Sequence, residues 1–130
     1  MNTRDAARRW KQTWQDAWPR HDVEAIAALY TPRCVYRALV FRDPERGVEG
    51  VRAYLQREFS VEQDVRCRFG EPVCGEDRAA VEWWASWTEQ GRELTLSGVT
   101  VLRFDDDGMV VDHRDYWNEV PQRVEPFPGW

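Results

Sequence analysis

The first half of the chain carries apolar side chains at helical spacing. Along residues 3–18 they recur at steps of three and four, which predicts a helix with one apolar stripe that Pro19 ends. Asp22 is placed to cap a second helix, and Pro32 would stop it. A third helix is predicted over residues 51–59. The buried face of the second helix is expected to comprise Val23, Ile26, Ala27 and Tyr30.

The rest of the chain is dominated by residues typical of strands. Residues 34–41 are rich in β-branched and aromatic side chains and precede turn residues, which predicts a strand and a loop. Gly91 and Gly108 would supply the positive φ of two hairpin turns. Beyond residue 64, alternating segments predict four antiparallel strands, at 65–74, 79–89, 93–104 and 109–119. Three helices followed by this meander predict an α+β fold, in which a curved sheet has helices on its concave side and a pocket at its open end.

One domain and one tail are expected. A chain of 130 residues has the commonest single-domain size. Residues 1–120 contain every predicted helix and strand. Residues 121–130 hold three prolines and show no period, so they predict an extended tail that either hangs free or lies across the fold.

Composition and charge exclude several classes of protein. The chain is 42% hydrophobic and has eight tryptophans, which excludes disorder and suggests that some indole rings line a cavity or an interface. The formal net charge is −5 and the basic residues are scattered, so nucleic acid is not an expected partner. No apolar run approaches the roughly twenty residues that cross a bilayer, and the N-terminus lacks a secretory signal. The three cysteines form no evident pair, which favours reduced thiols and a cytoplasmic location.

The last predicted strand carries the candidate chemistry. Alternation puts His113, Asp115 and Trp117 on one face of it. A carboxyl group among indole rings suits proton abstraction, and His113 could share its proton or orient it. An ion pair between Asp115 and an arginine such as Arg37 is the alternative, as is a histidine that is merely hydrogen-bonded. A metal at His113 and Asp115 would lack a third ligand, so no metal or cofactor is expected.

The segment HRDYWN at 113–118 resembles the closing strand of the SnoaL-like branch of the NTF2-like superfamily. Four further segments resemble the same family and occur in the same order as in it: DAWPRHDVEAIAALYTP (16–32), CVYRA (34–38), GVEGVRAYL (47–55) and LTLSGVTVLRFDDDG (94–108). Together the resemblance covers nearly the whole chain. The resemblance implies a cone of four to six mostly antiparallel strands wrapped on three helices. It also implies a homodimer formed through the convex face of the sheet.

Limonene-1,2-epoxide hydrolases, in the same superfamily, imply roles for particular positions. Their catalytic carboxylate falls at Asp115, and Tyr36 matches a tyrosine that holds their water. Where they use an asparagine this chain has Ala38. Where they use an arginine and a second aspartate it has Val81 and Trp83, or Glu82 if the register differs by one residue. SnoaL-type cyclases, which it also resembles, use one aspartate near the end of the sheet, assisted by a histidine.

The residues and the resemblance together predict an acid/base enzyme, an isomerase, cyclase, dehydratase or hydrolase, that acts on an apolar ring compound. Asp115 would be the base, Tyr36 would donate a hydrogen bond to a substrate oxygen or water, and His113 would tune Asp115. Trp84 is assigned to the dimer face. The cavity walls are expected to include Trp14, Trp18, Trp83, Trp87 and Trp117. A non-catalytic ligand-binding protein, or a dimerising accessory protein with a filled cone, is the alternative.

Overall fold

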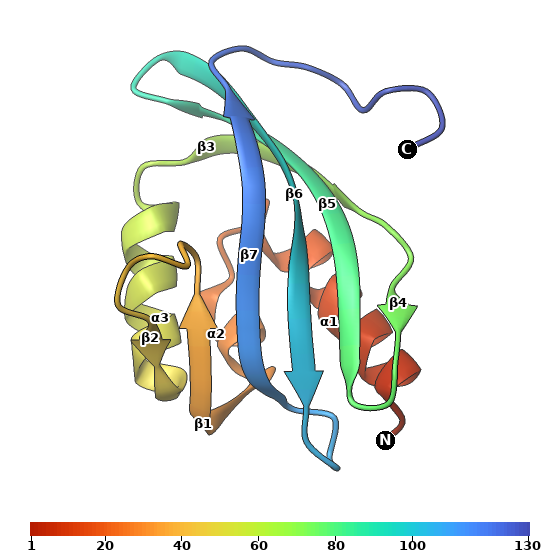
Figure 1. Ribbon diagram of the computed structural model, residues 1–130. Helices are drawn as coiled ribbons and strands as arrows, with labels where there is room; N and C mark the ends of the chain where they lie inside the picture. Colours follow the sequence, from red (N-terminus) through yellow and green to blue (C-terminus); the bar gives the residue numbers. More distant parts are fainter.

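The computed structural model describes all 130 residues, as three helices packed against one curved sheet (Figure 1). The sheet lies in front of α1 and α2 in Figure 1, and α3 flanks the edge formed by β1 and β2. The elements are α1 (Thr3–Ala17), α2 (Val23–Ala27), β1 (Tyr30–Arg37), β2 (Glu45–Arg46), α3 (Gly47–Phe59), β3 (Gln63–Phe69), β4 (Val73–Cys74), β5 (Arg78–Glu89), β6 (Arg92–Phe104) and β7 (Val110–Val120).

The sheet has seven strands in the order β2-β1-β7-β6-β5-β3, with β4 paired to β5. Every pair is antiparallel except β1 with β7, which brings the first and the last long strand side by side. The predicted α+β class and cone are therefore confirmed. There are more strands than the expected four to six because β2 and β4 have two residues each, too few to show an alternating pattern.

The first two helices begin at the polar caps that their sequences offer. Asn2 accepts a hydrogen bond from the backbone N–H of Asp5, and Asp22 accepts one from that of Ala25. The predicted apolar stripe is buried against the sheet, and it consists of Ala6, Trp10, Trp14, Ala17 and the C-cap residue Trp18. Ala7, which was not part of the predicted stripe, is also buried. None of the three helices combines the length and the hydropathy needed to cross a bilayer.

Two predictions around Tyr30 were wrong. Tyr30 is the first residue of β1 rather than the last apolar position of the second helix, which ends at Ala27. Correspondingly, β1 ends at Arg37 instead of reaching Phe41. Pro32 lies within β1, where the pairing with β7 is interrupted between Tyr30 and Val35, so its missing N–H breaks no ladder hydrogen bond.

A glycine allows the neighbouring strands β6 and β7 to approach closely at one point. Gly98 is opposite Trp117, and a Cβ atom at this position would lie 2.6 Å from the Cβ of Trp117 and 2.3 Å from the carbonyl oxygen of Tyr116. The two predicted hairpin glycines have the expected positive φ, 76° for Gly91 and 78° for Gly108.

The C-terminal tail lies across the convex face of the sheet, at the upper right in Figure 1. The backbone oxygen of Val124 accepts a hydrogen bond from the indole N–H of Trp84. The hydroxyl group of Thr95 donates to the backbone oxygen of Gln122 and accepts from the backbone N–H of Val124. The rings of Phe127 and Trp130 pack edge-on against Trp84. Trp84 thus points to the convex face, as predicted, but its own chain covers it.

Candidate active site

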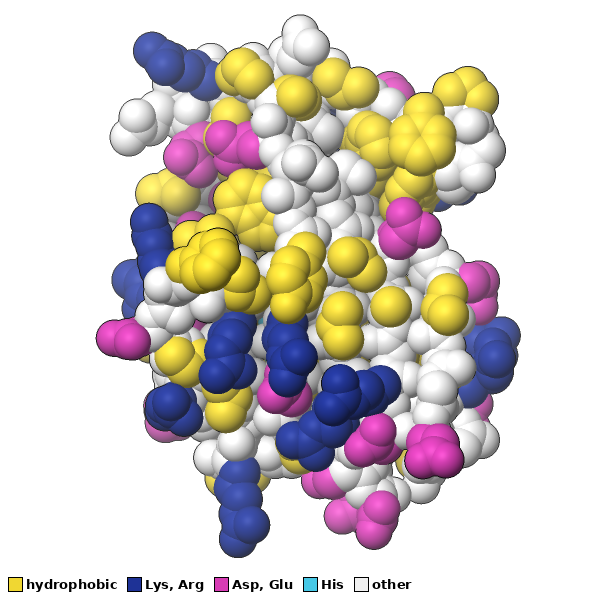
Figure 2. Space-filling view, viewed as in Figure 1, with side chains coloured by type: hydrophobic (Ala, Val, Ile, Leu, Met, Phe, Trp, Pro, Cys, Tyr) yellow, Lys and Arg dark blue, Asp and Glu magenta, His cyan; other side chains and the backbone are white.

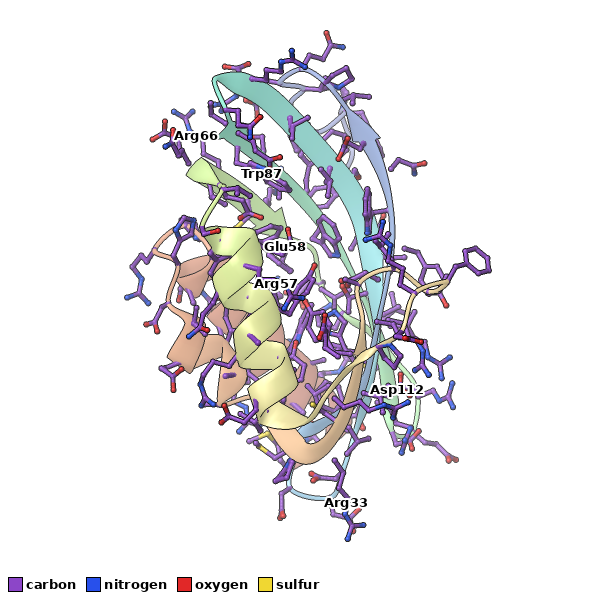
Figure 3. The ribbon with its side chains drawn as sticks, turned by 90° about the vertical axis from the view of Figure 1, so that its left-hand side faces the viewer. Arg33, Arg57, Glu58, Arg66, Trp87 and Asp112 are labelled. Atoms are coloured by element: carbon purple, nitrogen blue, oxygen red, sulfur yellow. The ribbon has the colours of Figure 1, made fainter.

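A cavity of about 490 Å³ lies between the helices and the concave face of the sheet. Its walls come from α1, α3 and the inner faces of β1, β5, β6 and β7. Figure 3 shows Arg57 and Glu58 on the side of α3 that faces the sheet, with Trp87 above them. All the site residues predicted from the sequence line this cavity, namely Trp14, Trp18, Tyr36, Trp83, Trp87, His113, Asp115 and Trp117.

The carboxylate of Asp115 is held through one oxygen only. Its Oδ1 accepts a hydrogen bond from the hydroxyl group of Thr100 at 2.7 Å and lies 2.8 Å from Nε2 of His113. Thr100 in turn accepts a hydrogen bond from the indole N–H of Trp83 at 2.9 Å. The other oxygen, Oδ2, bonds no protein group, and the side chain is 13% exposed. Asp115 therefore lines the cavity with one oxygen held in place and the other free of protein partners.

Tyr30 fixes which nitrogen of His113 carries the proton. The hydroxyl oxygen of Tyr30 accepts the indole N–H groups of Trp10 at 3.1 Å and Trp14 at 3.2 Å. Both lone pairs are then used, so the hydroxyl hydrogen is donated to Nδ1 of His113, 2.9 Å away. In the neutral imidazole the proton therefore sits on Nε2 and is donated to Asp115.

Tyr36 forms the wall beside this network. Its ring stacks on the imidazole of His113 with centroids 3.7 Å apart, and it also packs against Tyr54. Burial raises the pKa of Tyr36 well above its usual value, and the nearby negative charge of Asp115 adds to the effect. Tyr36 thus keeps its proton, and its hydroxyl group makes no hydrogen bond with the protein.

One connected aromatic wall is formed by Trp10, Trp14, Trp18, Trp83 and Trp87. Trp18 packs against Trp83 and Trp87, with ring centroids 6.0 and 5.8 Å apart. Trp87 donates its indole N–H to Glu89, and Trp117 donates to the backbone oxygen of Ala38. Each of these polar groups is satisfied, so the rings present mainly apolar surface to the cavity.

The partners of Asp115 and the position of Glu82 bear on the alternatives that the sequence leaves open. Asp115 forms no salt bridge with Arg37, and its only ionisable partner is His113. No group of three or more His, Cys, Asp or Glu side chains could hold a metal ion. Glu82 lies on the convex face, because Val81 and Trp83 take the inner positions of β5.

Three residues of the site were missed. Thr100 could have been found, because alternation along β6 puts it on the same face as Leu96 and Leu102. Tyr30 was assigned to a helix. Glu62 follows α3 in a polar stretch that shows no periodic pattern. In the structure, however, only 6% of Glu62 is exposed, and the residue lines the cavity.

A sequence model of the SnoaL-like domain matches residues 11–113, so the chain belongs to the SnoaL-like domain family. The match ends two residues before Asp115. No curated protein matches the sequence.

Solved structures share the fold at low sequence identity. One is the epoxide hydrolase/cyclase-like enzyme SalBIII, described in pyran ring formation in the polyether salinomycin. It has a TM-score of 0.76 and 18% identity over 88% of this chain and 91% of its own. Another is RV0760c from Mycobacterium tuberculosis, with a TM-score of 0.75 and 20% identity over 92% of this chain and 98% of its own. At these identities the likeness establishes the NTF2-like fold alone.

Proposed function

We propose that this protein is an acid/base enzyme that acts on an apolar ring compound, with Asp115 as the general base. The observation that carries the proposal is the unequal use of the two oxygens of Asp115. Two donors hold Oδ1, whereas Oδ2 bonds no protein group, and the residue lines an aromatic cavity. The description of SalBIII as epoxide hydrolase/cyclase-like, for a protein of the same fold, supports chemistry of this class.

The reaction would begin with proton transfer to Oδ2. Asp115 removes a proton from a ring carbon beside a carbonyl group, or from a water molecule that adds to the ring, and later returns it. His113 acts as a positioning residue, because its N–H holds Oδ1 and its tautomer is set by Tyr30. The free hydroxyl group of Tyr36 donates a hydrogen bond to a substrate oxygen. The indole rings exclude water and shape the ligand.

A non-catalytic binding protein is the second candidate. It is favoured by the apolar inner positions of β5, where Val81 and Trp83 stand in place of the arginine and aspartate of the related epoxide hydrolases.

One experiment separates the two candidates. Purified protein is assayed with a panel of cyclic enones and cyclic epoxides, with products followed by mass spectrometry and binding followed by calorimetry. We expect Asp115→Asn to bind the same compounds and to lose turnover. The matched control is Asp112→Asn, on the outer face of the same strand, which should keep both. Binding without turnover by the wild type would favour the binding protein, whereas turnover by Asp115→Asn at the wild-type rate would overturn Asp115 as the base.

We also propose that the protein forms a homodimer through the part of the convex face that the tail leaves open. Figure 2 shows a band of hydrophobic side chains across the middle of that face, above a group of basic ones. Phe41 is fully exposed, and Leu39 and Tyr116 are the other large apolar side chains in this region that are exposed. Light scattering should give a dimer for the wild type and a monomer for Tyr116→Arg.

A further inference from the structure

Glu62 is a buried carboxyl group that the proposed reaction does not yet use. It lies between α3 and β3 and projects into the cavity that holds Asp115. Its Oε1 accepts the indole N–H of Trp18 at 2.7 Å, and its Oε2 bonds no protein group. No arginine, lysine or histidine pairs with it, and Arg57, which also lines the cavity, binds Glu45.

The charged groups around Glu62 are acidic. Glu58 faces it from α3 and Glu89 faces it from β5, while Tyr54 of α3 and Cys67 of β3 are the other titratable neighbours. Burial, and then these two carboxylates, raise the pKa of Glu62 to about 8, against the lowering effect of the Trp18 hydrogen bond. At neutral pH the carboxyl group therefore retains its proton.

We propose that Glu62 is the proton donor of this cavity and recognises a ketone, epoxide or ether oxygen on the bound ring compound. With Oε1 occupied by Trp18, the O–H group on Oε2 is the part of the side chain that is free to meet a ligand. The inference rests on the proposed function and narrows its substrate class from apolar rings to apolar rings that carry an oxygen acceptor.

Asp115 and Glu62 occupy different walls of one cavity. The ring of Trp18, which bonds Glu62, packs on the ring of Trp83, and Trp83 bonds Thr100 beside Asp115. A ring compound lying on this aromatic wall can therefore face a base at one edge and an acid at the other.

For a cyclic ketone that carries a carbon–carbon double bond one carbon beyond the position next to the carbonyl group, the protons transferred balance, and the enol is part of a conjugated diene. Asp115 takes the proton from the carbon next to the carbonyl group, and the electrons of the broken C–H bond form the carbon–carbon double bond of an enol. The carbonyl oxygen accepts the proton of Glu62, which becomes a carboxylate. Return of a proton from Asp115 to another carbon of the conjugated system, and of the enol proton to Glu62, completes an isomerisation with no other reactant.

The test compares 1-tetralone with tetralin, its hydrocarbon counterpart, by isothermal titration calorimetry at pH 6.5 and pH 9.0. We expect the ketone to bind on the order of 10-fold more tightly than the hydrocarbon at pH 6.5, and to lose most of this advantage at pH 9.0. Glu62→Ala should lose the advantage at both pH values. Glu62→Gln, which keeps an N–H donor, should retain part of it without pH dependence. The matched control, Glu82→Gln on the convex face, should behave as the wild type.

Contrary results have distinct meanings. Equal binding of ketone and hydrocarbon by the wild type would overturn the role of Glu62 alone. Tighter binding of 1-aminotetralin than of 1-tetralone at pH 6.5, lost in Glu62→Gln, would also overturn it, because Glu62 would then already be an anion that binds a cation at that pH. Failure of both neutral probes to bind would overturn the proposed function together with this role. Independently of any ligand, a ¹³C titration of the Glu62 carboxyl carbon should show a midpoint near 8, and a midpoint below 5 would contradict the proposal.

Discussion

Thr100 and Asp115 lie directly opposite each other on β6 and β7, and the hydroxyl group of Thr100 donates a hydrogen bond to Asp115 at 2.7 Å. The same hydroxyl group accepts the N–H of Trp83, so Thr100 joins the aromatic wall to the carboxylate. Few residues could replace it, because the position needs a buried side chain that both accepts and donates.

Thr100→Val tests this link with almost no change in shape. The substitution leaves the indole N–H of Trp83 without its partner and removes one of the two donors to Asp115. We expect the free energy of unfolding to fall by about 1–3 kcal/mol, measured by urea denaturation. Thr88→Val, on the outer face of β5, is the control and should change it by less than about 0.5 kcal/mol. Equal effects of the two variants would mean that the buried hydroxyl group contributes nothing specific.

Tyr30→Phe should release the tautomer of His113. Without the hydroxyl group, Nδ1 of His113 loses its donor and the N–H groups of Trp10 and Trp14 lose their acceptor. We expect ¹⁵N NMR of the imidazole to show the Nε2–H form in the wild type and a mixture of forms in the variant. Tyr54→Phe, whose hydroxyl group has no part in the network, should leave the spectrum of His113 unchanged. An unchanged spectrum in Tyr30→Phe would contradict the assignment.

Glu62 should make the wild type less stable as the pH rises. Its pKa in the folded protein is about 8, above the ordinary value of 4.5, so the folded state binds more protons than the unfolded state between these values. Stability therefore falls from about pH 4.5 to about pH 8 and then levels. Glu62→Gln should remove this part of the slope, measured as the difference between wild type and variant in urea unfolding at pH 5 and pH 9. A parallel pH dependence in both proteins would show that Glu62 ionises normally.

Gly98→Ala tests the close approach of β6 and β7. The new methyl group would meet the backbone of Tyr116 and the side chain of Trp117, neither of which can move without disturbing the sheet. We expect a loss of stability of at least about 1–3 kcal/mol, or no folded protein. Gly75→Ala is the matched control, because its methyl group would meet nothing closer than 3.9 Å and should be tolerated.

Much of the inner face of the sheet was predictable from alternation alone. Once HRDYWN was assigned to a strand, a period of two fixed the common side of His113, Asp115 and Trp117, and the same rule placed Trp83 and Trp87. The role of these residues, and the division into a domain of residues 1–120 and a tail, stay predictions, as does the cytoplasmic location.

The remaining parts depend on contacts that no local pattern reports. Tyr30 continues the apolar spacing of α2, and only its pairing with Val110 of β7 makes it the start of a strand. Glu62 is polar in a polar stretch, and its burial follows from the packing of Trp18 and α3 around it. The tail covers Trp84 with a backbone oxygen and aromatic rings. Its proline-rich sequence predicts an extended chain but not these contacts.

The bond between Tyr30 and His113 also bears on how the protein folds. It joins residues 83 positions apart, within the one parallel strand pair of the sheet. Closing so long a loop costs chain entropy before any contact offsets it, and contacts of this kind slow folding. During synthesis, β1 leaves the ribosome long before its partner β7. The helices can form early, and so can the antiparallel strands from β3 to β6. The carboxylate of Asp115 meets Thr100, and His113 meets Tyr30, only when β7 docks as the last strand.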